Sequence, residues 1–171
     1  MDVYSACEQV ELLLNGRSLG VRPTTRTERL TATFEAPYEP GELKAVGYIG
    51  GKPAAETVLQ TVNPPAAIRL TPDRPNIGAD DLCYVTAEVV DSAGRVHPTA
   101  ENPIFFSVQG AGSLAALGSS NPQSTERYRG NQRSAFHGRC LAVVKSSSAG
   151  EIKLRAQADG LEAVEVVIRA G

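Results

Sequence analysis

Tryptophan is absent from this 171-residue chain, which has two histidines and only nine phenylalanine and tyrosine residues together. The scarcity of histidine leaves few candidates for a general base or a zinc ligand, because imidazole commonly fills both roles. Neither His97 nor His137 stands near a nucleophile-elbow pattern such as GxSxG, so we expect both to be structural. The shortage of aromatic rings also disfavours a lectin-like platform for sugars.

Long apolar runs and a strong charge bias are missing as well. No apolar run approaches the roughly 20 residues of a membrane span. The 17 basic and 19 acidic residues give a net charge of −2, without the basic bias of a nucleic-acid-binding protein. No signal peptide is visible, because Met1-Asp2 leads directly into strand-like sequence. We therefore expect no membrane or nucleic-acid partner, and an excised piece of a longer protein.

The three cysteines, Cys7, Cys83 and Cys140, are an odd number without CxxC spacing, which argues against a zinc site. Cys83 shares the apolar parity of its predicted strand, and Cys140 lies in another apolar strand. Buried free thiols explain both, since free cysteine is among the most buried residue types. The alternative is a Cys83–Cys140 disulfide between two sheets, although the tryptophan that packs on such a bridge in immunoglobulin domains is missing.

Acidic residues are numerous, but nearly all fall in turns or on the polar faces of predicted strands. Glycosidase chemistry needs two acids flanking one cleft, about 5–10 Å apart, and the sequence singles out no such pair. Asp80-Asp81 lacks the alternating ligands of a calcium-binding loop. We therefore predict no catalytic residue, no metal site and no cofactor in this chain.

The chain does contain alternating apolar and polar residues, which are typical of half-buried β-strands. Val10, Leu12 and Leu14 alternate in this way, and Asn15-Gly16 supplies the positive φ angles of a type I′ turn. No run of ten or more residues shows a helical period. The pattern predicts strands at 10–14, 17–21, 29–35, 43–49, 54–62, 82–90, 104–108, 113–117, 139–145, 152–158 and 164–168.

Asn63-Pro64-Pro65 interrupts this alternation, because proline cannot donate a ladder hydrogen bond. We place a domain boundary here, with a small domain at 1–63 and a second at 64–171. The second has close to the ~100 residues of an immunoglobulin-like sandwich. The predicted fold class is all-β, with two tandem immunoglobulin-like β-sandwich domains. A domain of about 60 residues is marginal, so we expect the first to be truncated at its N-terminus and to lean on a neighbour.

The stretch 118–133 is about sixteen residues long and has one large apolar side chain, Tyr128. Loops of this length without secondary structure are usually functional, interfacial or disordered. Arginine forks suit carboxylates, backbone carbonyls and aromatic faces. Three interpretations stay open: packing against a neighbouring domain, a mobile solvated loop, and a carbohydrate-binding surface. The candidate residues for a carbohydrate or interdomain contact are Asn121, Arg127, Tyr128, Arg129, Arg133 and Phe136.

Four stretches have distinctive sequences: VYSACEQVELLLNGRSLG, APYEPGELKAVGY, PAAIRLTPDRPNIGADDLCYVTAEVVDSAGRVHP and GSLAALGSSNPQSTERYRGNQRSAFHGRCLAVVKS. In this order they resemble the region that follows the catalytic barrel in bacterial glycoside hydrolase family 2 β-galactosidases. The last stretch carries the specific Asn-Pro, polar loop, aromatic and glycine of that region. Ser119-Ser120 departs from the family, which often has Gly or Asn in this turn. The resemblance covers essentially the whole chain.

This resemblance implies immunoglobulin-like accessory domains that brace or orient an upstream catalytic TIM barrel. The barrel and the other domains of the parent enzyme are then the expected partners. The family's catalytic glutamates belong to that barrel and match no position here. The resemblance also implies a bacterial parent that is periplasmic or extracellular. Two alternatives are a carbohydrate-binding module that uses the loop around Tyr128 and Phe136, and an adhesin-type spacer with no enzyme attached.

Overall fold

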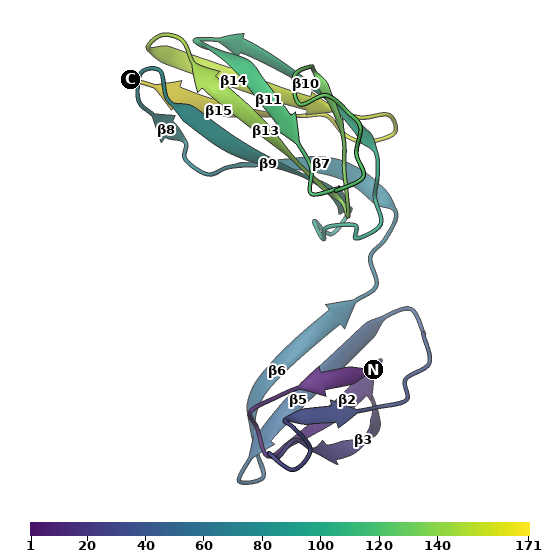
Figure 1. Cartoon of the computed structure of the whole chain (residues 1–171). Helices are drawn as coiled ribbons and strands as arrows, with labels where there is room; N and C mark the ends of the chain where they lie inside the picture. The colour runs from purple at the N-terminus through teal and green to yellow at the C-terminus, as the bar shows by residue number, and fades with distance from the viewer. The chain divides into compact units, whose positions relative to one another are not determined.

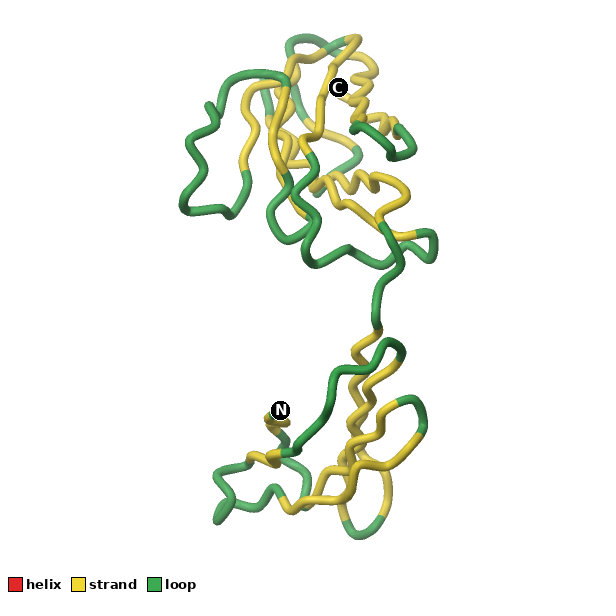
Figure 2. Tube along the Cα trace, turned by 90° about the vertical axis from the view of Figure 1, so that its right-hand side faces the viewer, coloured by secondary structure: helices red, strands yellow, loops and turns green.

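The computed structural model describes all residues, 1–171, and consists of strands and loops without a helix (Figure 2). The predicted all-β class is confirmed by fifteen strands that form four sheets. With no helix present, none is long and apolar enough to cross a membrane. The chain divides into two compact units, Met1–Thr61 and Val62–Gly171, called unit 1 and unit 2 below.

Unit 1 contains a four-stranded antiparallel sheet in the order β3-β2-β5-β6 and a two-stranded ribbon of β1 and β4 (Figure 1). Asn15 and Gly16 adopt φ angles of 51° and 77°, which confirms the predicted tight turn between β2 and β3. The strand bounds are β1 Asp2–Tyr4, β2 Gln9–Leu14, β3 Arg17–Pro23, β4 Thr31–Thr33, β5 Glu42–Ile49 and β6 Lys52–Gln60.

The strand predicted at 29–35 is mostly wrong, because only Thr31–Thr33 is a strand. Arg29 and Leu30 have φ angles of 54° and 58°, which belong to the left-handed region and not to a strand. The backbone N–H of Leu30 donates to the Thr25 carbonyl at 3.0 Å and closes a turn. This turn places β4 beside β1, and the two strands pair as the short antiparallel ribbon.

The core of unit 1 is small. Its buried cluster contains only Val10, Leu12, Ala32, Phe34 and Ala45. These side chains come from β2, from β4 and the residue that follows it, and from β5. Every residue of the edge strand β6 is exposed, on both faces of the sheet. The sheet of unit 1 is therefore covered over only part of its width.

Unit 2 is a sandwich of two sheets, in the orders β11-β13-β9-β7 and β12-β10-β14-β15-β8 (Figure 1). If β7, β9, β10, β11, β13, β14 and β15 are matched to strands A to G, these orders give the ABED and CFG sheets of the immunoglobulin fold. The strand bounds are β7 Pro65–Pro72, β8 Asn76–Ile77, β9 Leu82–Asp91, β10 Pro103–Gly110, β11 Gly112–Gly118, β12 Gln132–Ser134, β13 Arg139–Ser146, β14 Gly150–Gln157 and β15 Val164–Ala170.

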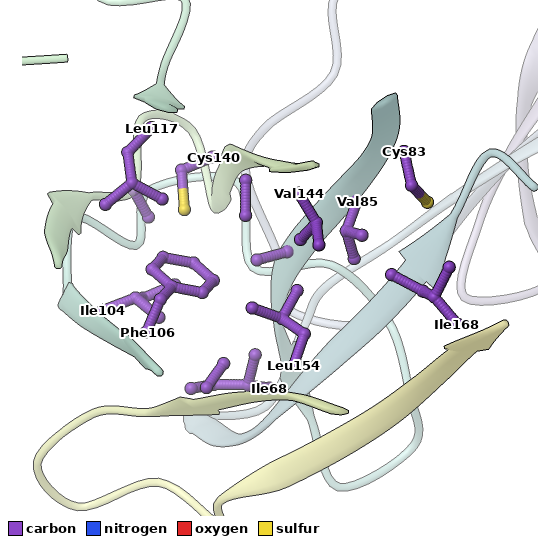
Figure 3. Packing of buried hydrophobic residues seen from close by; sticks show 14 of the residues in the cluster. Ile68, Cys83, Val85, Ile104, Phe106, Leu117, Cys140, Val144, Leu154 and Ile168 are labelled. Atoms are coloured by element: carbon purple, nitrogen blue, oxygen red, sulfur yellow. The ribbon is translucent and has the colours of Figure 1, made fainter. Parts of the chain in front are cut away.

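The core of unit 2 contains twenty buried residues. The inward-facing residues of β9 include Val85, Ala87 and Val89, all fully buried, and Leu154 of β14 is fully buried in the facing sheet. Figure 3 shows side chains from both sheets meeting in this layer, with Phe106 beside Ile104. Burial of one Val, Leu or Ile side chain contributes about 1.5–3 kcal/mol, so unit 2 has a far larger hydrophobic contribution than unit 1.

All three cysteines are buried and free. The alternative of a Cys83–Cys140 disulfide between the sheets is wrong, because both residues lie on neighbouring strands of one sheet. Cys140 pairs with Ala87, which is four residues along β9 from Cys83. At about 3.3 Å per residue this offset is roughly 13 Å, beyond the Cα separation of about 7 Å that a disulfide tolerates. Figure 3 shows the two thiols at different ends of the core.

Candidate functional site

The long loop connects the two sheets of unit 2. It leaves β11, an edge strand of one sheet, and ends in β12, which pairs with β10 at the edge of the other. We call residues 119–131 the crossing loop. The short strand β12, Gln132–Ser134, overlaps the end of the stretch 118–133, for which the sequence predicted no secondary structure. The crossing loop therefore closes one open side of the sandwich.

Arg133 lies beneath the crossing loop and is only 1% exposed. Its Nη1 donates to the Glu126 carbonyl oxygen at 3.0 Å, and its Nε donates to Ser119 Oγ at 3.3 Å. The Nε is also 3.6 Å from a carboxylate oxygen of Glu126. Arg133 ties the start and the middle of the crossing loop to β12, so it is structural and does not belong to the contact surface expected from the sequence.

The Glu126 carboxylate completes this arrangement. It accepts hydrogen bonds from the Ser134 backbone N–H at 3.0 Å, from Ser134 Oγ at 2.9 Å and from Ser124 Oγ at 3.2 Å. Burial alone would raise the pKa of Glu126, but the bonds from Ser134 and Ser124 and the charge of Arg133 hold the pKa below its usual value. The carboxylate is therefore ionised at neutral pH and balances the buried guanidinium.

The tip of the crossing loop consists of Arg127, Tyr128 and Arg129, all exposed. The Tyr128 carbonyl accepts the Leu117 backbone N–H at 2.7 Å, which fixes the tip beside β11. The Tyr128 ring is 68% exposed and lies 5.2 Å from the Arg133 guanidinium carbon, within cation–π range. The guanidinium groups of Arg127 and Arg129 form no hydrogen bond or ion pair. The tip is thus a fixed cationic and aromatic projection.

Asn121 and Phe136, the remaining predicted site residues, both take part in turns. Asn121 Oδ1 accepts the Gln123 backbone N–H at 2.9 Å. Phe136 is half-buried, packs edge-on against His137 with ring centroids 4.2 Å apart, and pairs through its backbone with Arg139. The Phe136 ring contacts the His137 ring and does not contact the Tyr128 ring. The structure therefore divides the six candidates into an exposed tip, a buried anchor and two turn residues.

A shallow groove of about 320 Å³ lies beside the start of the crossing loop, on the outer face of the β11-β13-β9-β7 sheet. Sequence reasoning missed it, because its lining comes from three strands and a loop that meet only in the folded chain. The one available signal was Gly118, a residue without a side chain directly after the strand predicted at 113–117. The lining residues are Thr86, Gly118, Ser119, Ser120, Arg139, Cys140 and Leu141.

The structure assembles no group of three or more His, Cys, Asp or Glu residues that could hold a metal ion. Thr99 Oγ1 lies 3.5 Å from His97 Nδ1, longer than the 2.6–3.2 Å of an activated nucleophile and its base. Asp73 and Asp81 both form ion pairs with Arg74. The two aspartates have lowered pKa values, whereas a general acid needs a raised one.

Comparison with known proteins places these features in a family. The model of the glycoside hydrolase family 2 C-terminal domain 5 matches residues 68–167, and a domain of unknown function matches residues 1–55. A β-galactosidase of Bacteroides ovatus is 40% identical over 170 residues, which are 98% of this chain and 20% of that protein. A putative β-glucuronidase of Formosa agariphila is 34% identical over 84% of this chain and 14% of its own length.

Solved structures agree with this match. A family 2 glycosyl hydrolase from Bacteroides cellulosilyticus superposes with a TM-score of 0.96 and 39% identity, over 99% of this chain and 22% of that one. A β-glycosidase from Bacteroides vulgatus superposes with a TM-score of 0.87 and 26% identity, over 98% of this chain and 22% of that one. This chain spans about a fifth or less of the curated relatives cited above. The matched residues 68–167 make up more than half of its length, and the chain belongs to the family of glycoside hydrolase family 2 C-terminal domains.

Proposed function

We propose that this chain is a non-catalytic accessory part of a larger β-galactosidase-type glycoside hydrolase. Its role is to brace the catalytic barrel and to fix the orientation of that barrel. The likeness to the C-terminal domain 5 of family 2 and the small share of each relative that the chain spans both favour this role.

The observation that carries the proposal is the exposure of β6. A strand with both faces in solvent contributes almost nothing to the core of unit 1. Leu59 is 57% exposed and Val58 is 43% exposed, on opposite faces of this edge strand. A long exposed edge with apolar side chains is a liability that natural proteins usually cover. A neighbouring domain of the parent enzyme would provide that cover.

A second feature of unit 1 supports the same conclusion. A groove of about 150 Å³ separates β1 from β6 on the core side of the sheet, and Val3, Ala45 and Ala55 contribute apolar lining. Tyr4, at its rim, is 77% exposed. Docking of the barrel domain against this face would bury apolar surface at about 25 cal/mol per Å² and would stabilise a unit whose own core has five residues.

The test is Leu59→Glu, made in the isolated chain and in the full-length parent enzyme. In the isolated chain, where Leu59 is largely in solvent, unfolding free energy should change by no more than about 0.5 kcal/mol. In the parent enzyme, where a neighbouring domain covers Leu59, the same substitution should lower the free energy of unfolding by about 2 kcal/mol or more. The loss should appear as a lower midpoint of thermal unfolding and a shorter half-life of galactoside hydrolysis.

Val167→Glu is the matched control, because Val167 is an exposed apolar strand residue of unit 2. It should have a small effect in both proteins. Equal effects of Leu59→Glu in the chain and the parent would contradict docking through β6. Turnover of an aryl β-galactoside by the purified chain would contradict the non-catalytic role.

A further inference from the structure

The floor of the groove in unit 2 is a row of three residues on neighbouring strands. Gly118 of β11 pairs with Leu141 of β13, which pairs with Thr86 of β9. A Cβ atom at Gly118 would meet no atom within 4 Å, so glycine is not required here by packing. Its effect is to leave open the space above Leu141, which offers an apolar surface at the base of the groove.

Arg139 forms one wall and is held in place from behind. Its Nε donates to Glu88 Oε1 at 3.0 Å, and the other oxygen of Glu88 accepts Arg69 Nε and Nη2 at 2.9 and 2.7 Å. Burial would raise the pKa of Glu88, but the two arginines lower it, so the carboxylate is ionised and fully engaged. The Nη1 and Nη2 groups of Arg139 donate to no protein acceptor. The three side chains together carry one net positive charge.

Hydroxyl groups surround the rest of the groove. Thr86 and Ser120 contribute hydroxyls that form no side-chain hydrogen bond within the protein, and Ser119 Oγ accepts only from Arg133. Arg127 and Arg129, whose guanidinium groups are unpaired, do not line the groove; they flank Tyr128, whose carbonyl accepts the N–H of Leu117, the residue before Gly118. A ligand at this place would meet hydroxyl partners, an apolar floor and a positive field.

The size of the groove limits the ligand. Ligand pockets in proteins measure about 300–1,000 Å³, and this one, at about 320 Å³, lies at the lower end. One pyranose ring matches that space better than an extended oligosaccharide. A planar guanidinium with two free N–H groups binds a carboxylate through a pair of parallel hydrogen bonds.

We propose that this groove binds a sugar that carries a carboxylate, a uronic acid residue, with Arg139 as the ligand of the carboxylate. The sugar hydroxyls are held by Thr86, Ser119 and Ser120, and the apolar face of the ring rests on Leu141. Gly118 admits the ring because it has no side chain. The proposal does not depend on docking through β6, which belongs to the other unit.

The test uses the whole 171-residue chain and two probes that differ only at one carbon, methyl β-D-glucuronide and methyl β-D-glucoside. Each is titrated while backbone amide shifts are followed by NMR. The glucuronide should produce saturable shifts at Gly118, Ser119, Ser120 and Leu141. The glucoside should bind roughly tenfold more weakly or worse, because it lacks the charge-assisted hydrogen bonds.

Three variants locate the binding site. Arg139→Gln removes the proposed ligand and leaves Glu88 paired with Arg69, and Gly118→Val fills the groove from a strand position that tolerates a side chain. Both should weaken glucuronide binding about tenfold or more. Lys145→Gln removes one charge from the same strand face, where Lys145 pairs with Asp80 outside the groove, and should leave binding unchanged.

Amide spectra of the variants should overlay that of the unsubstituted 171-residue chain away from the substituted position. This control shows that each variant is folded. Equal binding of the two probes would refute the role of the carboxylate. The absence of saturable shifts with both probes would refute the site itself. Glucuronide binding that survives both Arg139→Gln and Gly118→Val would place the sugar elsewhere and would also overturn the proposal.

Discussion

Replacement of Glu126 by alanine should destabilise unit 2 strongly, although Glu126 stands in a polar surface loop. The change removes the acceptor of three hydrogen bonds from Ser134 and Ser124. It also leaves Arg133, which is 1% exposed, without a counter-charge. A buried charge without a partner is among the few causes of large mutational losses.

The magnitude follows from the geometry. Removal of one partner of a buried ion pair costs about 3–5 kcal/mol. Two facts reduce this figure here: the Glu126 side chain is 32% exposed, and Arg133 keeps its bonds to the Glu126 carbonyl and Ser119 Oγ. We therefore expect a loss of about 2–3 kcal/mol. For a unit of this size, each 1 kcal/mol lowers the midpoint by roughly 4 °C, so the expected shift is about 8–12 °C.

Scanning calorimetry of the full chain at pH 7 provides the measurement. The transition of unit 2 should move and that of unit 1 should not. Glu165→Ala is the control, because Glu165 is an exposed strand carboxylate that forms no hydrogen bond or ion pair. Arg133→Met combined with Glu126→Ala should cost less than the sum of the single changes by about 1 kcal/mol or more. A shift under about 3 °C, or additive effects in the double variant, would refute the reasoning.

Two further predictions concern other buried groups. Burial would raise the pKa of Asp91, but backbone N–H groups of Asn63, Ala93 and Arg95 and the Arg95 side chain lower it. Its contribution to stability is therefore present above the unfolded pKa of about 3.9 and is lost as pH falls below it. Asp91→Asn should be less stable at pH 7 and should lose less between pH 4 and 2 in urea titrations; a parallel pH profile would disprove this role. Burial raises the pKa of Cys83 to about 11 and that of Cys140 to about 12, so neither should react with a thiol reagent at pH 8 until urea unfolds the chain. Peptide mapping separates these two thiols from Cys7, and rapid labelling of Cys83 or Cys140 in the native protein would contradict this.

The strands of unit 2 could be predicted from the sequence because their signal is local. The alternation from Cys83 to Val89 indicated one buried face, and all of its inward residues are fully buried. The Asn15-Gly16 turn was equally readable, because a left-handed conformation at two successive residues needs just such side chains. The strand expected at 29–35 is mostly wrong because two local signals compete there: its threonines favour a strand, but a turn closed by Thr25 and Leu30 prevails at Arg29 and Leu30.

The candidate site was less predictable because its parts are joined by non-local pairing. Arg133 has the same sequence character as Arg127 and Arg129, two of its exposed neighbours. Only the pairing of β12 with β10 turns Arg133 inward, and no periodicity in the polar loop announces that pairing. The groove likewise depends on Gly118 and Arg139, which are separated by the crossing loop and brought together by the register of β11 and β13.

The exposed strand β6 has a consequence for how such enzymes recombine. Unit 2, with twenty buried core residues, resembles a self-sufficient module that a gene fusion could move to a new host. Unit 1 differs, because every residue of its edge strand β6 is exposed. If a domain of the parent enzyme covers β6, as proposed above, a transferred unit 1 would need the matching face of that domain as well, and the two would be inherited together.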